Sequence, residues 1–561
     1  MAKLILSLLF LFPLTAHIFS QSDNAVVTGS FLQYQNVNGN IVLRTVTNPA
    51  ETGNYSQNIA TPPVVFQNSP LNNSMVRWSF TDPIAIGDRN ATSGTGLYEV
   101  TGWGLNTQRV SLYNNESNNP LWEYMTDPTT FTNNVAISDT GGVIASASHK
   151  QILAFNRTSS TPILNYNLSS LPISSAVGSA IDITNNGTFI IAGTSPSIFG
   201  DSSYILGIYK DSAQPSWKIV TGQTGAGGSG IQGIRICGND SLAIVNTYGG
   251  FYIIRTYTGQ IIYQGLINPS SNNGTQSPQA ISGDGNYIAT INYNGFVRVY
   301  QRSGNTYNFL WTHQEPPGIY YNWMTTVDIS NNGQYLACGT LNFLSSSSYD
   351  GKVKLFRTTN STPIWTYGGF GDEVQCVAFS KNGNVLVAAS WGDLNNANND
   401  MVVWKVSSLT NIPIFAVNAV GSSFWCSISN DGSTVTASGK KVHARTFGNG
   451  GEVYNMYIDT NDAPVGVINN NNIPYEYNLN QNYPNPFNPK TIINYQLAAG
   501  NYVRLIIYDV MGRETAVLVN QKQNAGTYEI EWDASNYPSG VYFYKLEAGD
   551  FVMSKKMVLI K

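Results

Sequence analysis

Apolar and polar residues alternate in short runs along most of the chain, and turn residues separate these runs. Alternation of this kind is typical of β-strands that bury one face. In 352–367, KVKLFRTTNSTPIWTY, an alternating strand is followed by a turn and by a second strand that carries aromatic residues. The same hairpin pattern recurs at 151–166, 204–219 and 296–311. The patterning therefore predicts an all-β protein.

A short block, polar–x–Asn/Asp–Gly–x–x–apolar–Ala, recurs between these hairpins. Successive copies start 46, 53, 45, 48, 50 and 49 residues apart. The Asn-Gly or Asp-Gly pair supplies the positive-φ positions of a tight turn, so each block predicts a hairpin of its own. A period of this length is that of one blade of a β-propeller. The copies begin at Ser138, Thr184, Cys237 (a degenerate copy), Ser282, Ser330, Ser380 and Ser429.

Two hairpins in each period predict a four-stranded antiparallel blade. The aromatic-bearing hairpin occurs eight times, because one at 109–124 precedes the first clear block. Upstream of it, 84–88 and 97–104 can supply the first two strands of that unit. We therefore expect a β-propeller over 75–458, with eight blades favoured. Seven blades, with the weak first unit serving as closure, is the alternative.

The blocks resemble those of WD-repeat-like and quinoprotein-like propellers, in which an S-x-D-G-x-x-[IV]-A hairpin is widespread. Examples in this chain are SGDGNYIAT at Ser282 and SNDGSTVTAS at Ser429. The resemblance implies the fold over most of the chain. It implies no activity, because this fold hosts enzymes and binding platforms alike.

The segment 478–561 has the period-two pattern of a separate β domain. Turn signals such as Met511-Gly512 and Pro538-Ser539-Gly540 divide its alternating runs, which predict a small Ig-like β-sandwich. Three prolines, Pro484, Pro486 and Pro489, lack the backbone N–H that a strand ladder requires. We therefore expect an irregular entry to the first strand. The alternating runs are Thr491–Leu497, Tyr502–Tyr508, Thr527–Trp532 and Val541–Leu546.

Several separated sequence blocks of this segment, in order at the end of the chain, resemble the type A C-terminal sorting domain. That domain is carried by cargo of the type IX (Por) secretion system of Bacteroidetes-type bacteria. The resemblance implies that the type IX machinery is a partner and that the protein is secreted or attached to the outer membrane at the cell surface. The residues that carry it are Asn482, Tyr483, Pro484, Asn485, Pro486, Phe487, Asn488, Pro489, Tyr508, Asp509, Gly512, Gly540 and Tyr542.

The other end of the chain also predicts export. Lys3 is followed by a short apolar run, Leu4–Ala16, whereas a membrane-spanning helix needs about 20 apolar residues. We expect a signal peptide at 1–20, removed near Ser20 or Gln21, and no transmembrane span in the mature chain. The segment 21–74 is expected to hold β-strands, either docked on the ring or as a leader. The Asn- and Pro-bearing stretch 459–477 is expected to be a linker.

Composition limits the classes of partner that we expect. The formal net charge is −4 over 561 residues and only 11% of residues are charged, which gives no reason to expect nucleic acid as a partner. Four cysteines are few for an exported chain of this size, and none stands in a CxxC pair. We expect buried free thiols, with one disulfide as the alternative.

The residues that known propeller enzymes require are hard to find here. The copies of the block lack the aromatic residue of a sialidase Asp-box. Thr258-Gly259-Gln260 is a single segment that weakly resembles a quinone-docking segment. No G-x-S-x-G elbow is present. His149, His313 and His443 stand far apart in the sequence. We assign no catalytic residue and no cofactor, with calcium as the one possibility.

Two kinds of loop residue are candidate ligands. The loop 390–404 gathers Asp393, Asn395, Asn398 and Asp400, whose oxygens suit calcium, although EF-hand spacing is absent and Asn-rich loops are often solvated turns. Aromatic residues in this and equivalent loops suit stacking on a glycan or gripping a peptide. These aromatic candidates are Phe199, Phe343, Tyr349 and Trp391.

The sequence thus favours a secreted or surface-attached propeller that acts as a binding or interaction module for an extracellular glycan or protein. The alternative is a propeller enzyme, a hydrolase or lyase acting on extracellular glycans at an axial site. Carboxylates that converge with an Arg or His at the axis would favour the enzyme. An axis lined by Ser, Thr and small apolar side chains would oppose it.

Overall fold

The computed structural model describes most of the chain in two compact units, Met1–Val465 and Gly466–Lys561. Apart from two single-turn 3-10 helices, η3 (Leu168–Ser170) and η4 (Val406–Ser408), the regular elements of the described residues are strands, so the all-β prediction is confirmed. No helix in these ranges is long and apolar enough to cross a membrane. The described residues are 30–37, 40–47, 64–66, 73–104, 107–126, 134–148, 150–172, 176–196, 202–221, 230–247, 249–267, 277–317, 322–345, 348–444, 448–462, 478–497, 501–523, 526–549 and 551–561.

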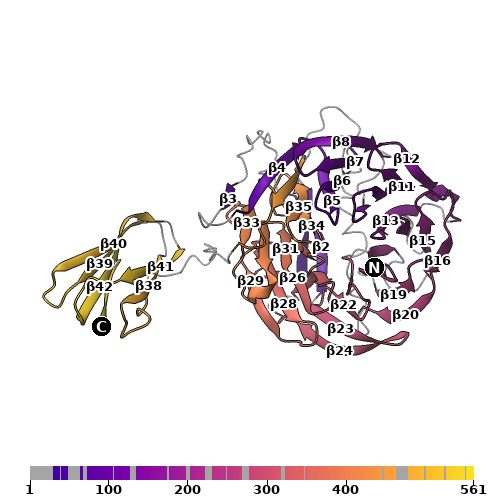
Figure 1. Ribbon diagram of the computed structural model, residues 1–561. Helices are drawn as coiled ribbons and strands as arrows, with labels where there is room; N and C mark the ends of the chain where they lie inside the picture. Colours follow the sequence, from indigo (N-terminus) through magenta and orange to yellow (C-terminus); the bar gives the residue numbers. More distant parts are fainter. Residues whose placement is uncertain are drawn as a thin grey trace. The chain divides into compact units, whose positions relative to one another are not determined.

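The first unit contains a ring of antiparallel sheets, which confirms the propeller class (Figure 1). Blade 1 is β5 (Ile86–Thr92), β6 (Tyr98–Gly104), β7 (Arg109–Asn114) and β8 (Ser117–Met125). Blade 2 is β9 (Asn134–Ile137), β10 (Val143–Ala147), β11 (Gln151–Asn156) and β12 (Pro162–Asn167). Blade 3 is β13 (Ala176–Ile183), β14 (Phe189–Pro196), β15 (Ser203–Tyr209) and β16 (Trp217–Thr221). Blade 4 is β17 (Ile231–Ile236), β18 (Leu242–Thr247), β19 (Gly250–Arg255) and β20 (Ile261–Leu266).

The second half of the ring follows the same order within each sheet. Blade 5 is β21 (Ala280–Ile281), β22 (Tyr287–Ile291), β23 (Phe296–Ser303) and β24 (Thr306–Gln314). Blade 6 is β25 (Trp323–Ile329), β26 (Tyr335–Phe343), β28 (Lys352–Arg357) and β29 (Pro363–Gly368), with β27 (Tyr349–Asp350) paired to β26. Blade 7 is β30 (Val374–Phe379), β31 (Val385–Ser390), β32 (Met401–Lys405) and β33 (Phe415–Asn418). Blade 8 has β34 (Ser423–Ile428), β35 (Thr434–Lys440) and β36 (Gly451–Tyr457). The first strand of each blade contacts the first strand of the next, and β34 contacts β5, so the ring is closed.

Blade 8 takes its fourth strand from the start of the ring. Strand β4 (Met75–Asp82) pairs antiparallel with β36, so residues 369 or more positions apart complete one sheet. Asp462, just after β36, accepts hydrogen bonds from the backbone N–H groups of Asn73 and Ser74, both at 3.0 Å. The closure therefore joins both ends of the repeat region, a feature that the sequence reading did not predict.

Upstream of the closure strand, the structure describes three further strands. Strands β1 (Ser30–Val37) and β2 (Asn40–Thr47) pair with each other as a hairpin. Strand β3 (Val64–Phe66) pairs with β33 and so adds a fifth strand to the outer edge of blade 7. The expected signal peptide lies outside the described residues.

The repeated block forms the turn between the first two strands of a blade, as predicted. In the copy at Ser380, the Ser380 hydroxyl donates to Asn382 Oδ1 at 2.7 Å, and the backbone N–H of Asn384 donates to the same oxygen at 3.0 Å. Gly383 then takes a positive φ of 73°. In the degenerate copy Asp240 occupies the Gly position with a φ of 59°, a conformation that Asp tolerates better than most residues. The conformation of the turn is therefore kept although its sequence varies.

The second unit contains two sheets around a shared core. One sheet has the order β37 (Asn478–Leu479), β38 (Lys490–Leu497) and β41 (Gly526–Asp533). The other has the order β40 (Glu514–Gln523), β39 (Asn501–Tyr508), β42 (Gly540–Ala548) and β43 (Phe551–Leu559). Side chains from both sheets, among them Phe487, Tyr495, Trp532 and Tyr544, form one buried cluster.

Candidate functional site

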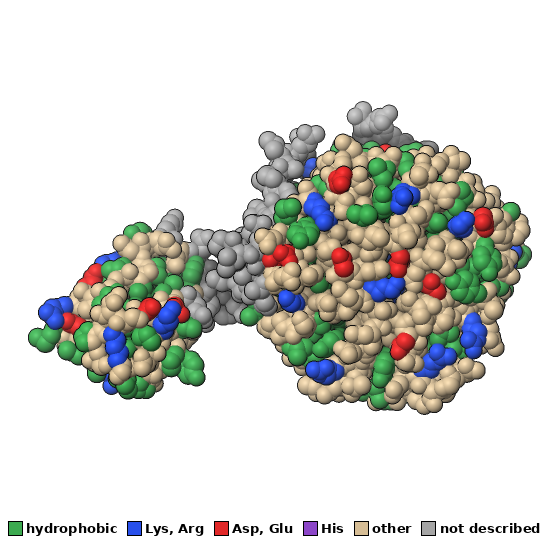
Figure 2. Space-filling view, in the orientation of Figure 1, with side chains coloured by type: hydrophobic (Ala, Val, Ile, Leu, Met, Phe, Trp, Pro, Cys, Tyr) green, Lys and Arg blue, Asp and Glu red, His purple; other side chains and the backbone are tan. Residues whose placement is uncertain are grey.

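The antiparallel order of each blade gives the ring two unlike edges. The repeated turns, and the turns between third and fourth strands, lie at one edge, which we call the turn edge. The loops between second and third strands, and the connections from blade to blade, lie at the other, which we call the loop edge. Figure 2 shows one face of the ring as a largely uncharged surface with few charged side chains, some of opposite sign side by side, in keeping with the low charge content.

A group of hydrogen-bonded polar side chains, which we call the polar latch, crosses the axis at the turn edge. Lys381, in the turn of blade 7, donates to Asp139 Oδ2 of blade 2 at 2.7 Å and to Asn185 Oδ1 of blade 3 at 3.0 Å. Asn430 of blade 8 donates to the same Asp139 oxygen at 3.2 Å. Backbone hydrogen bonds also join neighbouring turns, as from the Asn430 N–H to Gly94 O at 2.9 Å. The turn edge is thus tied together by side chains from at least four blades.

Above this latch the first strands present two layers of side chains to the axis. Residues two and four positions before the start of each block lie on the same side of their strand, because side chains alternate along a strand. The layer nearer the turn edge is mostly small, and Arg235 is its one basic residue. Its members are Ala91, Ala136, Asp182, Arg235, Ala280, Asp328, Ala378 and Ser427. The layer nearer the loop edge includes Arg89, Cys376 and Trp425.

Two aspartates and one arginine converge in the layer nearer the turn edge. Arg235 lies 3.6 Å from Asp328 Oδ1, and its side chain keeps 34% exposure although it stands on an innermost strand. Asp182 Oδ2 accepts the backbone N–H of Ile236 at 2.7 Å, and Asp328 Oδ2 accepts that of Phe379 at 2.9 Å. Burial raises the pKa of Asp182 to about 6. Both carboxylates therefore bridge neighbouring blades while they face Arg235.

Arg89 and Trp425 form the main contact of the second layer. The Arg89 guanidinium stacks on the Trp425 ring, with its carbon 3.8 Å from the ring centroid. Cys376, from blade 7, donates its thiol to Cys426 O at 3.3 Å. Although burial acts to raise it, hydrogen bonds with Cys426 and the charges of Arg235 and Arg89 lower the pKa of Cys376. All four cysteines are buried and free, as the sequence led us to expect.

Two of the predicted ligand-binding aromatics come together at the loop edge of blade 6. Phe343 and Tyr349 face each other across the β26–β27 pair, with ring centroids 5.6 Å apart. Phe343 also packs on Trp323 at 5.4 Å, and Trp323 packs on Tyr293 of blade 5 at 4.7 Å. The rings of Phe343 and Tyr349 are half-buried, and those of Trp323 and Tyr293 are buried. Phe199 lies outside the described residues.

Trp391 lies in the equivalent loop of blade 7 and bridges to blade 8. Its indole N–H donates to Gln375 Oε1 on an innermost strand, and its ring packs on Phe424 at 5.3 Å. The Lys440 ammonium lies 4.8 Å from the centre of the Trp391 ring. The ring is half-buried, so Trp391 has packing partners on two blades as well as an accessible part.

Two of the calcium candidates, Asp393 and Asp400, have partners within the protein. Asp393 accepts the N–H groups of Asn395 at 2.7 Å and Ala397 at 3.0 Å, which closes its own loop. Asp400 is fully buried and faces His443, with Oδ2 3.3 Å from His443 Nε2, and it accepts the Ala419 N–H at 2.7 Å. Burial raises the pKa of Asp400 to about 6. Within the described ranges, no three His, Cys, Asp or Glu side chains are grouped so that they could hold a metal ion.

Strongly exposed apolar side chains gather at the loop edge. Six large apolar residues of the described part of the ring are more than half exposed, and five of them lie at the loop edge: Met125, Val220, Leu266, Leu344 and Leu394. The sixth, Phe309, is 57% exposed and lies in the half of β24 nearer the turn edge. Leu394, at the tip of the blade 7 loop, is 72% exposed. Sequence patterning missed these leucines because Leu344 and Leu394 stand singly among polar loop residues.

In the second unit, the predicted motif residues fall into buried anchors and an exposed loop. Asn482 and Phe487 are each 2% exposed, whereas Tyr483 between them is 79% exposed. The Asn482 amide donates to Thr491 Oγ1 at 2.9 Å, and Asn485 Oδ1 accepts the Val558 N–H at 2.9 Å. The remaining residues of this loop, Pro484, Pro486 and Asn488, are exposed, and Pro489 is half-buried. The motif thus ties the entry loop to the last strand.

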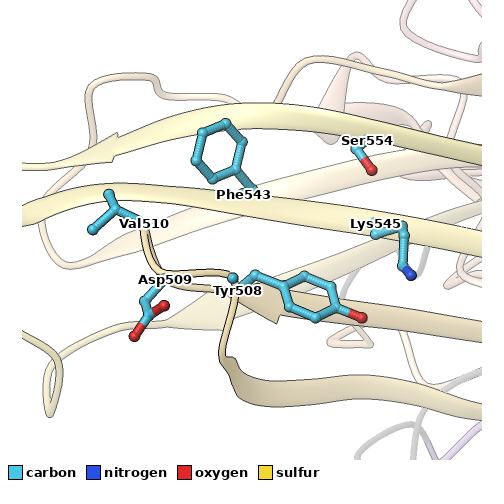
Figure 3. Close-up of a pocket in the computed structure, with 7 residues that line it drawn as sticks. Tyr508, Asp509, Val510, Phe543, Lys545 and Ser554 are labelled. Carbon is cyan, nitrogen blue, oxygen red and sulfur yellow. The ribbon is translucent and has the colours of Figure 1, made fainter.

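The later motif residues lie around a shallow hollow on the same unit. Tyr508, Asp509 and Gly512 line it together with Val510, Phe543, Lys545 and Ser554 (Figure 3). The Lys545 ammonium lies 5.3 Å from the centre of the Tyr508 ring. Asp509 accepts the N–H groups of Met511 at 2.9 Å and Arg513 at 3.0 Å, and Gly512 takes a φ of 75°. The Asp and Gly of this motif therefore build the turn that borders the hollow.

The two other motif residues flank the start of β42. Gly540 is exposed. Tyr542 is buried, its hydroxyl donates to Pro538 O at 2.8 Å, and its ring lies 5.4 Å from that of Trp532. Tyr542 therefore joins the shared core of the two sheets.

Comparison with known proteins places both parts of the chain. Residues 481–561 match the family model of the secretion system C-terminal sorting domain. Residues 316–357 and 361–404 match the WD domain, G-beta repeat. A solved structure similar to this chain is the β-propeller domain of Cps50 (Swd1) from Myceliophteria thermophila, with 12% identity, a TM-score of 0.41 and coverage of 56% of this chain and 96% of that one. No curated protein matches. The chain therefore carries WD40 repeats in a β-propeller and, at 481–561, a sorting domain that implies export by the type IX system to the cell surface or the medium.

Proposed function

We propose that this protein is an exported binding module whose propeller holds an extracellular glycan or protein at its loop edge. The observation that carries the proposal is the concentration of strongly exposed apolar side chains at that edge, with Leu344 at 58% and Leu394 at 72% exposure. Exposed apolar surface that is concentrated in one region of a protein, rather than scattered singly, is typical of interaction sites. Export supports the proposal, because the sorting domain delivers the ring to where such partners occur.

The neighbouring aromatic residues suit the same role. Phe343 and Tyr349 are held edge to face on a buried base of Trp323. Rings fixed by packing lose little conformational entropy on binding, which favours them as anchors for sugars and peptides. Leu344 follows Phe343 directly, so apolar and aromatic surfaces adjoin on the same loop.

The test is a binding screen of the exported full-length protein against a glycan array and against proteins recovered from the culture medium. For any partner found, the double variant Leu344→Ser/Leu394→Ser is compared with Phe309→Ser, which removes a similarly exposed apolar side chain near the opposite edge. We expect binding at least tenfold weaker in the double variant and unchanged in the control. Equal effects of both variants, or no partner in either screen, would overturn the proposal.

A second candidate function is favoured by the axial convergence of Asp182, Asp328 and Arg235. Two carboxylates that face one space, both with a pKa raised by burial, are the elements of acid–base chemistry on a glycan. The proposed activity is that of a hydrolase or lyase with its site at the axis. It is the weaker candidate, because each carboxylate already accepts a backbone N–H from the next blade.

The enzyme candidate is tested by assaying depolymerisation of acidic and neutral polysaccharides. Asp182→Asn and Asp328→Asn each keep an oxygen that can accept the backbone N–H, so the folds should survive. Loss of a measured activity in both variants would support the enzyme. Activity that is absent from the wild type, or unchanged in the variants, removes this candidate.

A further inference from the structure

We propose that the axis of the propeller is a binding site for a carboxylate group, held by the guanidinium groups of Arg89 and Arg235. The inference deepens the proposed binding function, on which it rests for the entry of a ligand from the loop edge. Its own basis is the unused donor capacity of these two side chains.

The N–H donors of Arg89 have no acceptor among the described residues. Its guanidinium stacks on Trp425 at 3.8 Å, and it forms no hydrogen bond or ion pair with any other residue of the described chain. A polar group on an innermost strand needs a partner, whether water or a ligand. Arg89 is only partly buried, and none of its nitrogens is among the solvent-inaccessible unpaired atoms. Its N–H groups therefore face a space that solvent reaches.

The guanidinium group of Arg235 lies in the same region. Its contact with Asp328 is an ion pair at 3.6 Å, longer than a direct hydrogen bond, and the side chain keeps 34% exposure. Arg235 and Arg89 come from innermost strands of blades 4 and 1, and both act electrostatically on the Cys376 thiol of blade 7. Two guanidinium groups from different blades thus lie near the same thiol.

Small side chains predominate around Arg235, and the polar latch closes one end of the axis. Five of the eight positions in the layer of Arg235 are Ala or Ser. At the turn edge the Lys381 latch spans the axis, with Lys381 bound to both Asp139 and Asn185. A ligand would enter from the loop edge, where Gln375, Trp391 and Phe424 lie next to the axis.

The arrangement favours a carboxylate over other anions. A guanidinium that lies over an aromatic ring still has N–H donors for a ligand, and the planar fork of these donors matches the two oxygens of a carboxylate. Asp88, Asp182 and Asp328 share the region and limit its net positive charge. A single negative charge therefore suits the site better than a multiply charged phosphate. The carboxylate could belong to a uronic acid or to a simple organic acid, and the probes below separate these two sources.

The experiment is isothermal titration calorimetry of the full-length protein with sodium D-glucuronate, sodium acetate and D-glucose. We expect glucuronate to bind and glucose, which lacks the carboxylate, to give no heat. Binding of acetate as well would identify a general carboxylate site, and its absence would identify a uronic acid site. In Arg89→Lys, which keeps the charge but loses the planar fork, binding should weaken at least tenfold. Arg255→Lys, at a half-buried arginine of β19 in blade 4, should change nothing.

Two outcomes would overturn the inference. One is that glucuronate and acetate bind no better than glucose. The other is that Arg89→Lys, with an unchanged circular dichroism spectrum, binds as the wild type does. If Arg89→Lys fails to fold, Trp425→Leu removes the stacking platform instead and is expected to weaken binding in the same way. Loss of partner binding in Leu344→Ser/Leu394→Ser with glucuronate binding intact would separate the loop-edge proposal from this one.

Discussion

At the scale of single residues, Glu99 shows how the ring tolerates a buried acid between blades 8 and 1. The side chain is fully buried, and Oε2 accepts from the Asn455 amide at 3.2 Å. Its Oε1 and the Thr101 hydroxyl are both buried without another partner. Burial raises the pKa of Glu99 to about 8. The neutral acid can donate to Thr101, which gives both oxygens a partner.

We expect Glu99→Gln to stabilise the protein at pH 8 and to have little effect at pH 5. An acid with a raised folded-state pKa contributes stability below its unfolded pKa, and this is lost as pH rises through the folded value. For a shift from 4.5 to about 8, the loss by pH 8 is on the order of a few kcal/mol. Melting temperatures of both proteins at pH 5 and pH 8 check this. A difference that does not depend on pH would contradict it.

The contacts of single residues near the axis could not be predicted from the sequence. Arg89 stands in GDRNAT, a polar stretch without a distinctive motif, and its partner Trp425 is more than 300 positions away. By contrast, Phe343 and Tyr349 were identified because they share one loop. The pairing of Asp400 with His443 was missed for the same reason as Arg89, since the two residues belong to different blades.

At the scale of elements, the turn blocks were predictable and the closure was not. A turn depends on neighbouring residues, so Ser-x-Asn-Gly at Ser380 specifies its own geometry. Strand β4 depends on a partner at the other end of the ring, and no local signal states that pairing. The alternation in Met75–Asp82 indicates a strand but not which sheet it completes.

The closure gives the second prediction. Asp462→Ala removes the acceptor of the Asn73 and Ser74 N–H groups and of the Ser74 hydroxyl. We expect a loss of about 1–3 kcal/mol, because these donors lose their carboxylate acceptor. Urea denaturation measures this, and limited proteolysis should cut near β4 sooner. Asp211→Ala, which removes one side of an exposed ion pair with Lys210, should cost about 0–1 kcal/mol. Equal losses in the two variants would argue against this role for Asp462.

At the scale of the whole molecule, opposing groups of acids set the pH dependence of stability. Burial raises the pKa of Asp88, Asp182 and Asp400 to about 6 and that of Glu452 to about 7. Their contribution to stability is lost as pH rises through these values. Although burial acts in the opposite direction, hydrogen bonds with backbone N–H groups and Arg109 lower the pKa of Asp82. Its contribution is lost as pH falls below the usual aspartate range.

The melting temperature is therefore expected to peak at about pH 4, the usual aspartate pKa, and to decline toward both pH 3 and pH 8. A series of thermal melts between these limits checks the expectation. A melting temperature that climbs steadily from pH 5 to pH 8 would show that the buried acids are ionised without cost.

The division into two units yields a prediction about export. The two sheets of the second unit share one buried core that includes the motif residue Phe487. Phe487→Ala should weaken this core by about 3–5 kcal/mol and reduce the amount of protein at the surface and in the medium. The ring should keep its own fold. Cell fractionation measures the distribution, and Tyr502→Ala, at a 58% exposed aromatic of β39, is the control. Normal export of Phe487→Ala would contradict the expectation.

The whole-molecule claim is that an exported propeller binds its partner at the loop edge. Hydrogen–deuterium exchange of the full-length protein, with and without a partner from the binding screen, tests this most directly. We expect the partner to slow exchange in 343–345 and 390–400, at the loop edge of blades 6 and 7, and to leave the turns at 138–141 and 380–383 unchanged. Protection confined to those turns would contradict the claim.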